Sequence, residues 1–207
     1  MSPGRVRSAI ATASFAVAAS LVIAACAGPA GSLVPSAASP TASVPSDPAT
    51  SADGGAIVVD DGLLDILPAQ VAGIDLVSDP DTAAAIASDP DLATTASAIA
   101  VAIAVAPGAS DDDDVAVVSV VQLKPGVFDD AFYRSWRDTY DAAACEPAGG
   151  VDGNAQAEIG GHETYIGTCA QGAFTYHVHL EELERFVSIT SVGERRLGEQ
   201  VVAGIGE

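Results

Sequence analysis

Apolar residues alternate with small ones over several stretches of this chain, which is the two-residue period of a β-strand. In residues 98–106, AIAVAIAVA, isoleucine or valine stands at every second position with alanine between. The β-branched run VAVVSVVQL follows at residues 115–123 and predicts a second, largely buried strand. We expect these two strands to form a hairpin whose loop holds Asp111–Asp114.

Two consecutive segments, SDPDTAAAIA at residues 78–87 and SDPDLATTAS at residues 88–97, begin with the same four residues. An Asp before a Pro suits the start of a helix, where the carboxylate accepts a backbone N–H bond and the proline fits the first turn. The repeat therefore predicts two short helices, capped by Asp79 and Asp89.

Aromatic residues recur at every fourth position in residues 128–144, a spacing that predicts an amphipathic helix. Phe128, Phe132 and Trp136 would face the core. The charged residues expected to face outward are Arg134, Arg137, Asp138 and Asp141. A last short helix is expected over residues 194–205.

Three further strands are expected between these helices, over residues 157–169, 173–181 and 185–192, the first with a turn at Gly160–Gly161. Together the elements predict an α+β domain in which a mainly antiparallel sheet of about five strands packs with helices. The length of residues 56–207 suits a single domain of this kind.

The N-terminus has the pattern of a secretory signal, because Arg5 and Arg7 precede an uncharged stretch from Ser8 to Ala25. Its end, Ile23-Ala24-Ala25-Cys26, resembles the lipobox of bacterial lipoproteins. The resemblance implies that residues 1–25 are a signal peptide, cleaved before Cys26. It also implies a diacylglyceryl group on the Cys26 sulfur, usually an added N-acyl chain such as palmitate, and a stable anchor on the extracytoplasmic side of the cell membrane. A plain signal peptide with an incidental cysteine is the alternative.

Residues 26–55 are almost entirely Ala, Ser, Pro, Gly and Thr, a composition that predicts a disordered tether. A flexible chain of this length reaches roughly 30 Å. The full chain has 8 basic and 28 acidic residues, and loss of the two signal arginines leaves a net charge of −22. Such acidity excludes nucleic acid as a partner.

Cys145 and Cys169 are the two cysteines that remain if Cys26 is lipidated. An even pair in an exported protein predicts a disulfide. The alternative is that both thiolates bind a metal together with histidines.

His177 and His179 lie two residues apart in a predicted strand, so both face the same side, as zinc ligands must. His162 would supply the third ligand if the strand register allowed it. The alternative is the polar face of a half-exposed strand. Asp111–Asp114 is either a calcium site or a solvated loop.

The sequence has no glycine-rich phosphate loop and no nucleophile elbow, so we name no catalytic residue and no cofactor apart from zinc. The order of the late strands and the last helix is similar to that of PsbP-like lipoproteins, a family that implies binding and assembly rather than catalysis. We therefore expect a monomeric, non-catalytic module that binds a ligand or an envelope protein. A zinc-dependent hydrolase centred on His177 and His179 and a structural envelope component are the alternatives.

Overall fold

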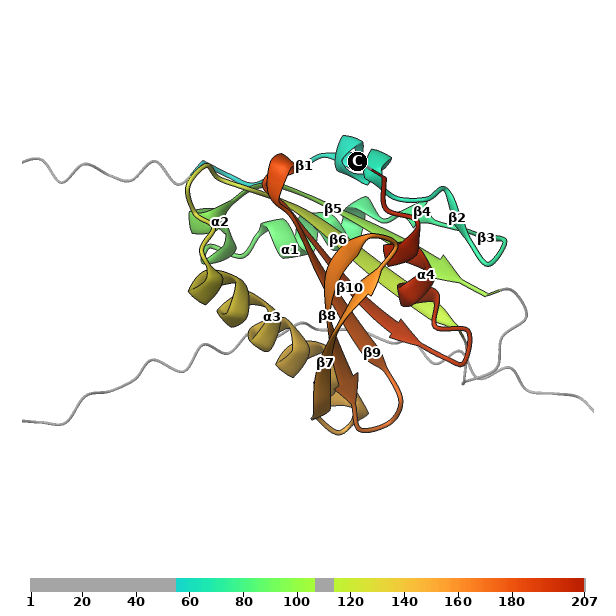
Figure 1. The fold of residues 1–207 in the computed structure, drawn as a ribbon. Helices are drawn as coiled ribbons and strands as arrows, with labels where there is room; N and C mark the ends of the chain where they lie inside the picture. The colour runs from blue at the N-terminus through green and yellow to red at the C-terminus, as the bar shows by residue number, and fades with distance from the viewer. Residues whose placement is uncertain (1–54, 107–113, 207) are drawn as a thin grey trace, which may run out of the picture. The chain divides into compact units, whose positions relative to one another are not determined.

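The computed structural model describes residues 55–106 and 114–206 of the 207-residue chain. These residues form an α+β fold around a mixed, mainly antiparallel eight-stranded sheet with the order β1-β5-β6-β10-β9-β8-β7, and β4 also pairs with β5 (Figure 1). The strands of this sheet are β1 Val58–Val59, β4 Val77–Ser78, β5 Ala96–Val105, β6 Val115–Leu123, β7 Val151–Ile159, β8 His162–Cys169, β9 Phe174–Leu180 and β10 Arg185–Val192. The other elements are η1 Asp61–Ile66, β2 Gln70–Val71, β3 Ile74–Asp75, α1 Pro80–Ala87, α2 Leu92–Thr95, α3 Asp130–Cys145, η2 Glu146–Ala148, η3 Glu181–Leu183 and α4 Leu197–Ala203.

The predicted hairpin of two apolar strands is confirmed, because β5 and β6 pair antiparallel along their whole length. The sheet, however, has eight strands rather than about five. Two of the missed strands, β1 and β4, have only two residues each and are too short to show a period. The third is β7, because the strand predicted over residues 157–169 contains β8 and only the last three residues of β7, before the Gly160–Gly161 turn.

One face of the sheet carries the larger core. Here the alanines of β5, such as Ala100 and Ala104, are fully buried, and their small side chains let η1 and the β2–β3 pair lie close to the strand. Helix α4 covers the neighbouring strands, with Val201 completely buried. An added Cβ at Gly198 would lie 2.6 Å from the Tyr176 ring, which explains how closely α4 approaches β9.

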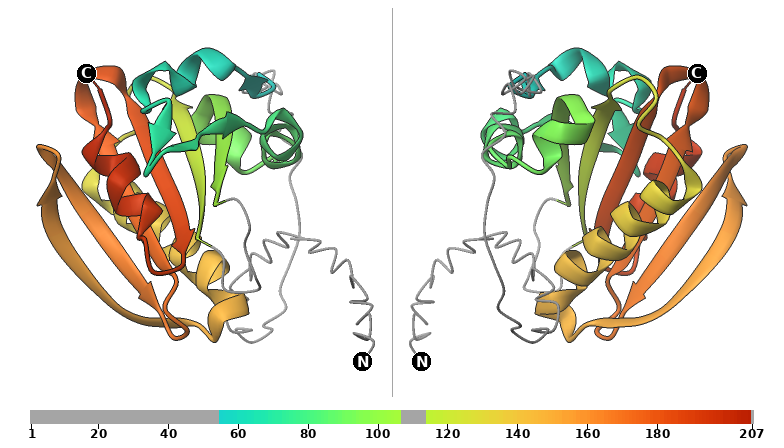
Figure 2. Two further views of the ribbon diagram at one scale, coloured as in Figure 1. Left: turned by 90° about the vertical axis from the view of Figure 1, so that its right-hand side faces the viewer. Right: turned by 90° about the vertical axis from the view of Figure 1, so that its left-hand side faces the viewer.

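The opposite face is covered by α1, α2 and α3 (Figure 2). Its core contains Ile99, one of the bulky residues that alternate with the alanines of β5, together with Val121 and Phe186. The aromatic side of α3 packs here: the Trp136 ring centroid lies 5.6 Å from that of Phe186. Burial of both faces makes this a three-layered arrangement.

The helix starts agree with the sequence at α1 and differ at α2. The Asp79 carboxylate accepts the Thr82 N–H at 3.1 Å and caps α1, with Pro80 in the first turn. Asp89 instead accepts the N–H of Asp91, and α2 begins only at Leu92 and has four residues. The second copy of the repeat therefore forms a turn followed by one helical turn.

Candidate functional site: a buried Asp–His network under helix α3

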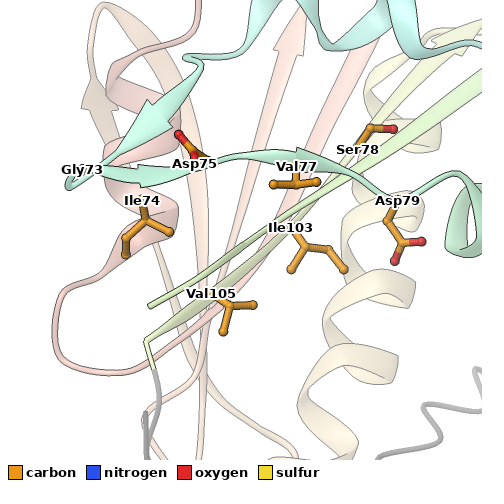
Figure 3. Close-up of a pocket in the computed structure, with 8 residues that line it drawn as sticks. All are labelled: Gly73, Ile74, Asp75, Val77, Ser78, Asp79, Ile103 and Val105. Atoms are coloured by element: carbon orange, nitrogen blue, oxygen red, sulfur yellow. The ribbon is translucent and has the colours of Figure 1, made fainter. Parts of the chain in front are cut away.

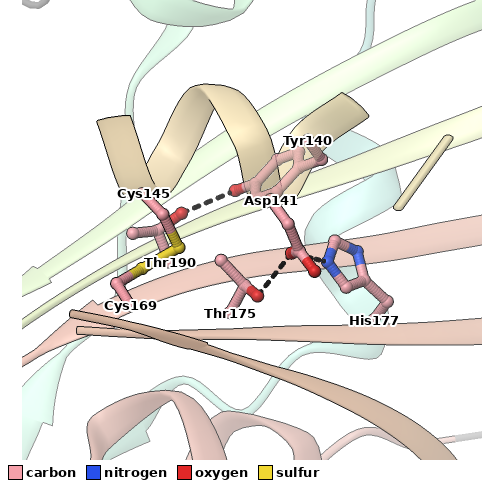
Figure 4. Close-up of a disulfide and its surroundings, with 7 residues drawn as sticks. All are labelled: Tyr140, Asp141, Cys145, Cys169, Thr175, His177 and Thr190. Carbon is pink, nitrogen blue, oxygen red and sulfur yellow. Dashed lines mark hydrogen bonds and ion pairs between the residues drawn. A yellow bond between two sulfur atoms is a disulfide. The ribbon is translucent and has the colours of Figure 1, made fainter. Parts of the chain in front are cut away.

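His177 lies in β9, a strand with neighbours on both sides, beneath helix α3 (Figure 4). Its side chain is 1 % exposed, so the expectation of a half-exposed polar strand is wrong at this position. The imidazole Nε2 lies 2.8 Å from Asp141 Oδ1, and Nδ1 lies 3.0 Å from Ser188 Oγ of the adjacent strand β10. Both ring nitrogens therefore have protein partners.

Asp141 is 3 % exposed, and the prediction that it faces solvent is wrong. Besides the contact with His177, its Oδ1 accepts a hydrogen bond from the Thr175 hydroxyl. Gly167 in β8 leaves space for the side chains of Thr175 and Asp141. A Cβ added at Gly167 would lie 2.2 Å from Thr175 Oγ1 and 2.7 Å from Asp141 Oδ2. A buried carboxylate is stable only with such partners, because desolvation is costly.

The network continues into the core through Ser188. The Trp136 indole N–H donates to Ser188 Oγ at 3.1 Å, and the Ser119 hydroxyl donates to the Ser188 carbonyl at 3.1 Å. One proton assignment satisfies all these atoms: His177 Nε2–H donates to Asp141, and the Ser188 hydroxyl donates to His177 Nδ1.

Serine, histidine and aspartate in contact are the residue types of a nucleophile, a general base and the group that orients the base. Catalysis would also need a place for the substrate next to the serine. Ser188 is 1 % exposed, its Oγ is already bonded to Trp136 and His177, and neither hollow described below is lined by these residues. The hydrogen bonds of this network therefore join α3 to strands β9 and β10 of the sheet.

The three histidines of the zinc hypothesis do not come together. His179 shares the α3 face with His177 but stacks on Phe128, with ring centroids 3.7 Å apart. Partial burial lowers the pKa of His179, against a smaller opposing effect of Glu181. His162 lies on the opposite face, where Nε2 is 3.3 Å from the Ile205 carbonyl oxygen. Over the part of the chain that the structure describes, no group of three His, Cys, Asp or Glu side chains could hold a metal ion.

The disulfide between Cys145 and Cys169 is confirmed. It joins the last residue of α3 to the last residue of β8, with Cα atoms 5.1 Å apart and both residues buried. Since Asp141 lies one turn before Cys145, the bond fixes the end of the helix that carries the buried carboxylate (Figure 4). Because the two sulfur atoms are bonded to each other, the alternative in which both thiolates bind a metal is wrong.

Two predicted features lie outside the described residues. These are Cys26, with the signal peptide and most of the tether, and the run Asp111–Asp113. Asp114, which is described, accepts the Arg195 backbone N–H at 2.7 Å and lies 3.1 Å from the Arg195 guanidinium. Among the helices of residues 55–106 and 114–206, none combines the length and apolar character needed to cross a bilayer.

A hollow of about 560 Å³ lies at the margin of the sheet, beneath the segment that joins β3 to β4 (Figure 3). Its apolar lining includes Val77, Ile103 and Val105, and its charged lining is Asp75 and Asp79. Asp79 is engaged by Thr82, and these hydrogen bonds lower its pKa. Asp75 accepts a bond from Gln70 and points away from Val105 (Figure 3). The polar groups therefore do not converge on one ligand.

A second hollow, of about 310 Å³, lies beside the start of α4. Arg195 and Arg196 line it together with Glu194 and Glu199, so its charges are mixed. The Arg196 guanidinium is already placed over the Phe174 ring, 4.6 Å from the centroid. This second hollow lies between α4 and the end of β7, where Ile159 lines it, and most of its lining residues are charged or polar.

Comparisons with family models, with curated proteins and with solved structures found no significant match to this chain.

Proposed function

We propose that the chain is a lipid-anchored extracytoplasmic lipoprotein whose folded body is a non-catalytic interaction module of the cell envelope. The observation that carries this proposal is the Cys145–Cys169 disulfide. Disulfides persist in exported proteins and are rare in the cytosol, where thiols are kept reduced. The bond also leaves Cys26 as the only one of three cysteines free for the lipidation that its lipobox implies.

The absence of a catalytic role is supported by the geometry of the best catalytic candidates. These are Ser188, His177 and Asp141, which are all buried and hydrogen-bonded to other protein groups. The described histidines face different layers or are engaged by neighbours, so no observation favours the zinc-dependent alternative. A rigid body on a tether with a reach of roughly 30 Å suits contact with other envelope components.

Metabolic labelling with an alkyne analogue of palmitate tests the anchor. The full chain is produced in a bacterial host beside a Cys26→Ala variant and a Cys145→Ala/Cys169→Ala variant. We expect label and membrane association in the wild type and in the double variant, and neither in Cys26→Ala. Equal labelling of the wild type and Cys26→Ala, or none in either, would refute the proposal.

A further inference from the structure

Strand β7 forms an open edge of the eight-stranded sheet. It is bonded to β8 on one side, and no other described strand pairs with its outer side (Figure 2). Seven of its nine residues are exposed and the other two are partly exposed. A strand in this position presents a row of backbone N–H and C=O groups that can pair with another chain.

The opposite edge of the sheet is protected and β7 is not. The outer side of β5 is occupied by the short strands β1 and β4. Edge strands are usually blunted by proline, lysine or a bulge. β7 contains no proline or lysine, and its register shift lies at the very start, between Val151 and Gly153. The uncharged stretch Gly153–Ala157, with small or amide side chains, pairs regularly with β8 and leaves its outer side open.

The charge around this edge selects the partner. Three exposed carboxylates lie on or next to this edge: Asp152 and Glu158 in β7, and Glu163 of β8, which pairs with Glu158. The basic residues Arg195 and Arg196 lie at one end of the strand, in the hollow lined by Ile159. Asp152 and Glu158, both exposed, flank the uncharged stretch of β7. A second copy of the chain fits poorly, because antiparallel pairing centred on Ala155 would bring Asp152 of each copy close to Glu158 of the other. Like charges directly opposite each other destabilise a strand pair.

We propose that the β7 edge accepts an extended, basic segment of a partner protein as an added strand. This rests on the proposed function and names the surface and the partner chemistry of the interaction module. Backbone hydrogen bonds would provide most of the affinity, as in other cases of strand addition. Lys or Arg residues opposite Asp152 and Glu158 would provide the selectivity and make the affinity fall with added salt.

A short peptide tests the proposal. The probe is a fluorescein-labelled Lys-Thr-Val-Thr-Val-Thr-Lys peptide, whose lysines are six positions apart, as are Asp152 and Glu158. Binding to the full chain in detergent micelles is followed by fluorescence anisotropy. The edge variant is Asp152→Lys/Glu158→Lys. The matched control, Asp65→Lys/Asp91→Lys, makes the same charge change at two exposed residues of η1 and of the turn before α2.

We expect the edge variant to bind the peptide about tenfold or more weakly, and the control variant to differ from the wild type by less than about twofold. The same peptide N-methylated at alternate amides should not bind, since it cannot complete the added strand. This arm leaves the protein unchanged and does not depend on how the variants fold.

Equal weakening in both charge variants would overturn the proposal, as would binding that survives N-methylation or no binding up to about 1 mM peptide. A wild-type dimer in sedimentation velocity that the edge variant abolishes would also overturn it in favour of a second copy. Because the labelling of Cys26 is measured separately, a failure here leaves the lipoprotein proposal standing.

Discussion

Substitution of Asp141 by alanine should be among the most damaging single changes in this protein. It removes the carboxylate that accepts from Thr175 and His177, and it leaves both donors inside the core with no other partner there. Each buried donor left unsatisfied costs about 1–3 kcal/mol. We therefore expect the free energy of unfolding to fall by about 4 kcal/mol.

Urea unfolding followed by tryptophan fluorescence measures this change directly. Trp136 is the only tryptophan, and its indole donates to Ser188 within the same network. With a urea dependence of about 2 kcal/mol per molar, the transition midpoint should fall by roughly 2 M. The matched control is Asp138→Ala on the same helix, since the Asp138 side chain is 60 % exposed and its loss should cost less than about 0.5 kcal/mol.

A double-variant cycle isolates the contact. Asp141→Leu/His177→Leu replaces both partners with apolar side chains, so we expect it to be less destabilised than the sum of its single variants by about 2 kcal/mol. A loss below about 1 kcal/mol for Asp141→Ala, or strict additivity in the cycle, would refute the view that these two residues form a buried pair.

Three further predictions follow from buried contacts. Gly167→Ala should lower the free energy of unfolding by about 1–3 kcal/mol, because the added Cβ would collide with Thr175 and Asp141. The control Gly153→Ala has open space at the Cβ position and should change the free energy of unfolding by less than about 0.5 kcal/mol in the same urea assay. Cys145→Ala/Cys169→Ala should lower the free energy of unfolding by about 3 kcal/mol, because the unfolded chain is no longer constrained by the disulfide. An unchanged urea midpoint would contradict this prediction. Burial raises the pKa of all four tyrosines, to about 12 for Tyr133 and Tyr176. Tyrosines of the unfolded chain lose their protons near pH 10, whereas those of the folded protein lose them only at higher pH. The free energy of unfolding should therefore be at its full value below about pH 10 and fall as the pH rises through about 12. Tyrosinate absorbance at 295 nm that is complete near pH 10.5 in the folded protein would contradict this.

Local patterns in the sequence were enough for the elements that have a regular alternation or a clear start signal. Strand β5 could be predicted because its bulky residues alternate with alanine, and α1 because Asp79 and Pro80 form a recognisable helix start. Strand β7 has no alternation, since both of its faces are largely exposed, and only the Gly160–Gly161 turn indicates that it is separate from β8.

The buried network could not be predicted from such patterns. An aspartate in an amphipathic helix is normally assigned to the solvent side, and Asp141 departs from that rule because of His177, 36 residues later in the chain. The space for it depends on Gly167 in a third element. One signal was present in the sequence: a histidine in a strand of apolar and β-branched residues needs a polar partner once it is buried. The identity of that partner depends on how α3 lies across the sheet.

The most direct test of the proposed lipoprotein is the intact mass of the protein extracted from the membranes of a producing bacterium. The account predicts a chain that begins at Cys26, carries a diacylglyceryl group on that residue and retains the Cys145–Cys169 disulfide. A chain that begins elsewhere, or one with an unmodified thiol at Cys26, would contradict it.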